Sequence, residues 1–148
     1  SSLIRIKTMA RTDTFRKHHE DILSIAREIN ALLGDSIDDS AAETIRKLMS
    51  KLAGQVTVHL AMEDKGLYPD LLSHGDASVK ATAQRFSEEM GSVAAAFVGY
   101  IKAWPTSAAI KEDPSRFTTE SKAIFNALSK RIHRENVELY VLLDALAV

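Results

Sequence analysis

Apolar residues recur every three or four positions along four long segments of the chain, and no segment alternates apolar and polar residues as a half-buried β-strand does. This spacing places the apolar side chains on one face of an α-helix, so each segment is predicted to be a helix roughly 30–45 Å long. Four such helices joined by short loops predict an all-α fold, an antiparallel up-down-up-down four-helix bundle. The predicted helices cover about residues 12–33, 41–67, 77–103 and 115–146.

Residues with known preferences for helix ends mark several of these boundaries. Gly34 directly follows the first apolar stripe, where a left-handed C-terminal cap is expected. Ser40 and Glu43 have the spacing of a capping box, which predicts that the second helix begins there. Pro69 is expected to end the second helix and Pro105 the third, because proline cannot continue the hydrogen-bond ladder.

Composition limits the partners and the location. The 148 residues are the length of one domain, so residues 1–148 are expected to form a single unit. A net charge of −1 gives no extended positive electrostatic potential that would attract nucleic acid or an anionic membrane surface. The lack of cysteine excludes metal sites with thiolate ligands. The apolar runs are far shorter than the roughly 18 residues of a membrane span, and the first residues do not resemble a signal peptide. The expected location is therefore the cytoplasm.

Histidine and glutamate residues stand at inward positions of the predicted helices. His59 lies four residues before Glu63, so imidazole and carboxylate can reach the same inward point. In the first helix, His19 is in phase with Phe15 and is favoured as the inward ligand, while His18, turned by about 100° from it, is a further candidate ligand.

The fourth helix contributes His133 and Glu138, five residues apart. That spacing places the two groups on either flank of the inward face, which suits two neighbouring metal ions better than one. The three histidines and two glutamates would then converge from three helices as a ligand set for iron, manganese or zinc. Each pair alone also fits a solvated contact on one helix, but their coincidence at inward phases of three helices favours a metal site.

These motifs together resemble the hemerythrin-like, or HHE cation-binding, domain, and the resemblance runs from about residue 12 to 146. The motifs that carry it are His18-His19-Glu20, His59-x-x-x-Glu63, Leu67-Tyr68-Pro69 and His133-x-x-x-x-Glu138. Membership of that family implies a four-helix bundle with a non-haem di-iron centre. By position, His19, His59 and Glu63 resemble ligands of one iron. Glu63 and Glu138 resemble the two bridging carboxylates, and His133 resembles a ligand of the second iron.

The third helix departs from the family pattern because it contains no histidine. Met90 and Ala94 fall where the family has its histidine ligands. A thioether is a poor ligand for a ferric oxygen-carrying site, and alanine cannot bind a metal at all. Glu89 is a candidate replacement donor, with Tyr100 as a further option. Alternatively, one ion is bound by His19, His59, Glu63 and Glu138, with His133 beside them.

Two functions remain open from the sequence. The leading hypothesis is a non-haem iron protein with a di-iron centre that binds or senses a small oxidant, namely dioxygen, nitric oxide or peroxide, or handles iron. A single iron, manganese or zinc is also compatible, and the residues Met90, Gly91 and Ala94 would leave room for the small ligand. The alternative is a metal-depleted regulatory or protein-interaction bundle without redox activity. No residue marks a substrate site, so catalysis stays undecided.

Overall fold

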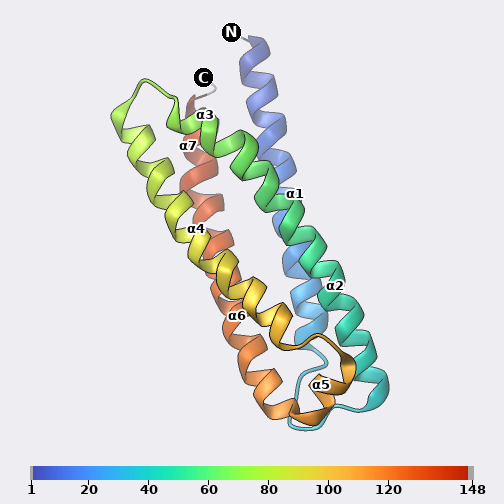
Figure 1. The fold of residues 1–148 in the computed structure, drawn as a ribbon. Coiled ribbons are helices and arrows are strands. Elements are labelled where there is room, and N and C mark those ends of the chain that lie inside the picture. Colours follow the sequence, from blue (N-terminus) through green and yellow to red (C-terminus); the bar gives the residue numbers. More distant parts are fainter. Residues whose placement is uncertain (1, 147–148) are drawn as a thin grey trace.

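The computed structural model describes the backbone of residues 2–146 and the side chains of residues 12–146. Within that part of the chain all regular elements are helical, and the long helices pack side by side along an elongated bundle (Figure 1). The elements are α1 (Ser2–Asn30), α2 (Asp39–Met62), the π-helix η1 (Glu63–Leu67), α3 (Tyr68–Leu72), α4 (Ala77–Ala103), α5 (Ser107–Glu112), α6 (Pro114–Arg134), the π-helix η2 (Glu135–Leu139) and α7 (Tyr140–Leu146).

The long helices follow the predicted segments, with differences at their ends. Helix α4 has the predicted bounds, because Asp76 caps its start and the chain leaves the helix before Pro105. Helix α1 begins earlier than predicted, at Ser2. The short helix α5 lies in a stretch predicted to be a loop, and its first turn is capped by the hydroxyl of Thr106.

Two expected caps are replaced by other residues. Gly34 is not a left-handed cap, since no described glycine has a positive φ. Instead its N–H donates to the Thr118 hydroxyl at 3.0 Å, and its carbonyl accepts from that hydroxyl at 3.0 Å. The N-cap of α2 is Asp38, two residues before the expected cap Ser40, because the carboxylate of Asp38 accepts the N–H of Ala41 at 2.7 Å.

Pro69 does not end the second helix. The chain continues from α2 through η1 into α3, and Pro69 stands in the first turn of α3. A proline is tolerated in a first helical turn, because its missing N–H is not needed there. The π-helix directly before it thus lets the helical rod continue to Leu72.

The apolar core has two clusters, and a layer of polar side chains lies between them along the helices. The cluster toward α5 includes Ile29, Ile45 and Met49, all completely buried. The other cluster includes Phe86 and Leu139, which are equally buried. Burying each such side chain stabilises the fold by about 1.5–3 kcal/mol. The polar layer is therefore the part of the interior whose stability cannot come from the burial of apolar side chains.

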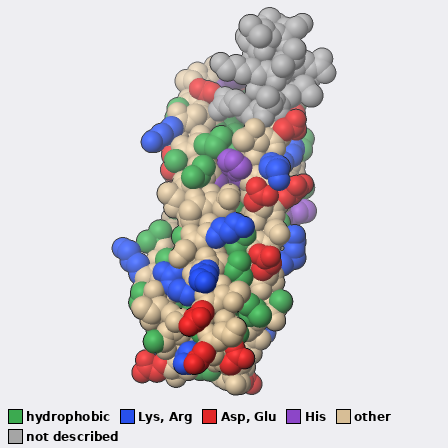
Figure 2. Space-filling view, turned by 90° about the vertical axis from the view of Figure 1, so that its right-hand side faces the viewer, with side chains coloured by type: hydrophobic (Ala, Val, Ile, Leu, Met, Phe, Trp, Pro, Cys, Tyr) green, Lys and Arg blue, Asp and Glu red, His purple; other side chains and the backbone are tan. Residues whose placement is uncertain are grey.

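The surface is mixed in charge on the face shown in Figure 2, where basic and acidic side chains are interspersed. This matches the small net charge of −1. None of the helices in the described part of the chain combines the length and the apolar character that crossing a membrane would require.

Candidate metal centre

Four buried side chains from three long helical rods meet in the polar layer. They are His19 of α1, His59 of α2, Glu63 at the start of η1 and Glu135 at the start of η2. One donor atom from each lies within 4.8 Å of the others, and each residue is at most 2% exposed. Imidazole nitrogens and carboxylate oxygens gathered in this way are typical ligands of iron, manganese and zinc.

The local helix geometry aims these side chains inward. His19 lies between the buried residues Phe15 and Ile22 on one face of α1. Each glutamate is the first residue of a π-helix, in which the backbone hydrogen bonds span five residues instead of four. π-helical turns inside α-helices are frequent at functional sites, because they change which side chains share a face.

The donor atoms are close enough to bind one ion together. His59 Nε2 lies 2.9 Å from Glu63 Oε1. The Nε2 atoms of His19 and His59 are 3.0 Å apart. His19 Nε2 is also 3.2 Å from Glu135 Oε1. The other ring nitrogen of His19, Nδ1, lies 2.9 Å from Asn136 Oδ1. With Nδ1 assigned as the donor of that hydrogen bond, the lone pair of Nε2 points into the cluster, as metal binding requires.

Two tyrosine hydroxyls touch the carboxylates. The hydroxyl of Tyr140 donates to Glu63 Oε1 at 2.9 Å, and that of Tyr68 donates to Glu135 Oε2 at 3.5 Å. Burial, followed by the charges of Glu63 and Glu135, raises the pKa of Tyr68. Burial, followed by the charges of Glu135 and Glu63, also raises the pKa of Tyr140. Both phenols are therefore protonated around neutral pH before a cation is bound.

The surroundings shift the pKa values of the two carboxyls in opposite directions. Burial and the neighbouring Glu63 raise the pKa of Glu135 well above its ordinary value. Burial acts in the same direction on Glu63, but hydrogen bonding to His59 and the charge of that ring outweigh it, so the pKa of Glu63 is lowered. Burial and the nearby His59 lower the pKa of His19 to about 4. These shifts favour an ionised Glu63 and a neutral His19, whereas the raised pKa of Glu135 favours its protonated form, from which a binding cation displaces the proton.

Two unsatisfied oxygen atoms show that the site fits a cation. Glu63 Oε2 and Glu135 Oε1 are buried and accept no hydrogen bond. A buried carboxylate oxygen without a partner costs free energy, and a bound cation would supply the missing interaction. The donor set and the unpaired oxygens therefore agree with a metal held by His19, His59, Glu63 and Glu135.

His133 and Glu138, which were expected to converge on the site, lie elsewhere. Both are exposed, and Glu138 accepts a hydrogen bond from Arg134 at 3.2 Å. Glu135 stands in the site instead, because it lies three residues after Ile132 on the buried face of the rod. The apolar stripe that predicted the other ligands also contains Glu135, but the five-residue spacing of His133 and Glu138 drew attention to the flanks of the helix instead.

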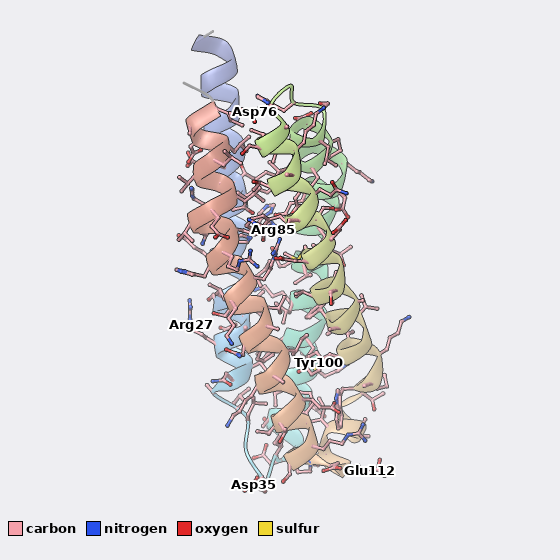
Figure 3. All side chains as sticks on the ribbon, turned by 90° about the vertical axis from the view of Figure 1, so that its left-hand side faces the viewer. Arg27, Asp35, Asp76, Arg85, Tyr100 and Glu112 are labelled. Atoms are coloured by element: carbon pink, nitrogen blue, oxygen red, sulfur yellow. The ribbon has the colours of Figure 1, made fainter. Side chains whose placement is uncertain are left out.

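The other candidate ligands, His18, Glu89 and Tyr100, are not donors of this cluster either. His18 is half-buried beside His59, with their Nδ1 atoms 3.4 Å apart. Glu89 forms ion pairs with Arg131 and Arg134. Tyr100 lies toward the α5 end of the bundle (Figure 3), where its hydroxyl is 2.6 Å from Ser121 Oγ.

A small cavity separates the cluster from the third long helix. Its volume is about 20 Å³, and Met90 and Ala94 of α4 line it together with His19, His59 and Glu135. A space of this size holds about one water molecule. Gly91, the third residue expected to make room there, is exposed and does not line the cavity.

Comparison with known families agrees with this site. The hemerythrin HHE cation-binding domain matches residues 10–143, so the chain belongs to that family. Neither the curated proteins nor the solved structures gave a match to the chain. The family and the buried histidine–glutamate cluster together point to metal binding.

Proposed function

We propose that the chain binds iron through His19, His59, Glu63 and Glu135 and that it binds or senses a small oxidant there, such as dioxygen, nitric oxide or peroxide, or handles iron. The observation that carries the proposal is the buried four-residue cluster with two unpaired carboxylate oxygens. When bound, iron would supply a redox-active centre with positions open to a small molecule.

The donor set favours one ion per chain. Metal–ligand bonds to nitrogen and oxygen are about 2.0–2.2 Å long, so the ligand atoms of one ion are at most about 4.4 Å apart. The four donors lie within 4.8 Å of one another, slightly beyond that limit, so a small inward movement of the side chains would bring all four onto one ion. Two kinds of ligand expected for the second iron are missing: the third helix contains no histidine, and His133 is exposed instead of pointing inward. Two ions remain possible only if the unpaired oxygens of Glu63 and Glu135 bind the second one.

The protein's own groups prepare the site for this task. Asn136 holds the His19 ring with Nε2 toward the cluster. Glu135 gives up a proton when a cation arrives, and its charge then balances that of the ion. The cavity beside Met90 and Ala94 offers a space for a small ligand next to the donors, with apolar walls that exclude bulk water.

We also propose that the four long helices run in the up-down-up-down order of an antiparallel bundle. The order of the rods in Figure 1 and the short connections between them support this arrangement. It brings α1, α2 and α6 together around one polar layer, as the metal site requires.

Metal analysis of the purified protein tests the proposal. We expect about one iron per chain after anaerobic reconstitution with ferrous iron. Glu63→Gln and Glu135→Gln should each weaken iron binding at least about tenfold, because an amide is a far poorer ligand than a carboxylate. Glu138→Gln is the matched control and should load fully, because Glu138 is exposed and outside the cluster.

Three other results would contradict parts of this proposal. Two irons per chain would restore the dinuclear centre. Full loading of the Glu135→Gln protein together with loss of iron in the Glu138→Gln protein would favour the ligand set inferred from the family spacing. Absence of iron after reconstitution would support the metal-free interaction bundle instead.

A further inference from the structure

We propose that Tyr140 is itself a ligand of the metal and binds a trivalent ion as a phenolate. This inference rests on the proposed function, since it assigns a further donor to the same site. It goes beyond the histidine and glutamate residues because a phenolate would define both the charge of the centre and its colour.

The hydroxyl of Tyr140 lies among the donor atoms. It is 2.9 Å from Glu63 Oε1, 3.2 Å from His19 Nε2 and 3.5 Å from His59 Nε2. Neighbouring ligand atoms around one ion with bonds of about 2.0–2.2 Å are about 2.8–3.6 Å apart. The spacing of the phenol oxygen from three other donors falls within this range, so the oxygen occupies a ligand position.

The π-helix η2 brings Tyr140 to this position. The N–H of Tyr140 donates to the carbonyl of Glu135, five residues earlier, which places the two side chains above one another on the inward face. The Tyr140 ring stacks on the rings of Phe15 and His19, with centroid distances of 5.6 Å and 5.2 Å. Packing on these rings holds the hydroxyl in the cluster without a contribution from the metal.

Tyr68 provides the contrast within the same site. Its hydroxyl contacts the outer carboxylate oxygen, Glu135 Oε2, at 3.5 Å. The oxygen of Glu135 that lies near His19 is the other one, Oε1. Tyr68 is therefore a neighbour of a ligand, whereas Tyr140 is placed among the ligands.

The charges favour a trivalent ion when Tyr140 binds as a phenolate. Coordination replaces the phenolic proton, which leaves to solvent. The phenolate and the carboxylates of Glu63 and Glu135 then contribute three negative charges, and a histidine that binds a metal does so as a neutral imidazole. A buried site is most stable when its charges cancel, so this ligand set matches ferric iron and disfavours divalent zinc.

Absorption and resonance Raman spectra test the inference, recorded after the protein reconstituted with ferrous iron has been exposed to dioxygen, which takes up the electron as the bound iron becomes ferric. Phenolate bound to ferric iron gives a charge-transfer band in the visible range, and Raman excitation within that band enhances vibrations of the tyrosine ring. We expect the natural protein to show both signals. Tyr140→Phe should lose them, and Tyr68→Phe, the matched control, should keep them.

The outcomes separate this inference from the proposed function. Iron bound without phenolate signals in the natural protein would overturn the role of Tyr140 and leave the metal site intact. Signals that survive Tyr140→Phe and vanish in Tyr68→Phe would overturn it as well. Absence of bound iron would instead contradict the proposed function. Whether phenolate signals are present is decided by the spectra of the natural protein alone. This part of the test therefore does not require that Tyr140→Phe folds.

Discussion

Arg131 brings a buried positive charge to the same level of the bundle as the candidate metal site. Its side chain is 4% exposed, and its guanidinium lies 4.4 Å from the centre of the Phe86 ring. It donates to the Phe86 carbonyl at 2.6 Å and to Glu89 at 2.9 Å. These contacts join α6 to α4, and they explain why Glu89 acts in helix packing and not as a metal ligand.

Replacing Arg131 should therefore cost more stability than replacing its neighbour Arg134, which contacts the same carboxylate. Arg131→Met should lower the free energy of unfolding by about 2 kcal/mol, because it removes buried hydrogen bonds while the remaining Glu89 can still be hydrated. Arg134→Met should lower the free energy of unfolding clearly less than Arg131→Met does, because that ion pair is exposed and screened by solvent. Urea denaturation in the presence of a chelator measures both, and equal losses would contradict the structural role of Arg131.

At the level of residues, helical phase predicted the ligands that lie at the centre of an apolar stripe and failed at its flanks. His19, His59 and Glu63 were identified from their positions on apolar stripes, and the structure brings these three together. His133 and Glu138 were placed on the two flanks of the inward face and lie on the surface, whereas Glu135 continues the apolar stripe of its helix. The sequence could not distinguish Tyr140 from an ordinary core tyrosine, because it does not show which groups the hydroxyl of the side chain contacts.

At the level of elements, the long helices were predictable and the π-helices were not. A stripe of three- and four-residue spacings indicates an α-helix, and both ends of α4 follow from it together with its flanking residues. One π-helical turn adds a single residue to the helix and leaves the apolar face continuous. A search for apolar residues at α-helical spacing therefore does not detect it. Both π-helices begin at a glutamate of the site, which indicates that they serve the site more than the fold.

Deleting Val137 tests the role of η2. The residue is 49% exposed and contributes little to the core, and its removal allows the helix to continue as a regular α-helix. The spacing between Glu135 and Tyr140 would then change by up to about 1.5 Å, a large error for a metal site. We expect iron binding to weaken at least about tenfold, as for other disturbances of ligand orientation. The free energy of unfolding without metal should stay the same or rise.

A substitution at the same position provides the control. Val137→Ala keeps the chain length and the π-helix, so iron binding should be unchanged. Isothermal titration with ferrous iron under anaerobic conditions measures both proteins, and urea denaturation in chelator measures their stability. If the deletion variant binds iron as the natural protein does, the π-helix does not position the ligands.

At the level of the whole molecule, the site joins helices that otherwise meet through two separate apolar clusters. Its ligands come from the helical rods that contain α1, α2 and α6. Without a cation, the layer between the clusters contains buried carboxylate oxygens that accept no hydrogen bond. The metal-free bundle is therefore expected to be weakest at this layer, since unpaired buried polar atoms cost free energy.

Removing the metal should consequently lower the thermal stability of the entire bundle. An ion that binds only the folded chain stabilises it by about 2.7 kcal/mol when its free concentration is about 100 times Kd. For a chain of this size, that corresponds to a fall in Tm of about 5–10 °C on chelation. Circular dichroism melting with and without chelator measures the change. Glu135→Gln should melt at nearly the same temperature in both conditions, because it binds iron poorly. An unchanged Tm in the natural protein, with iron shown to leave on chelation, would mean that the ion does not hold these helices together.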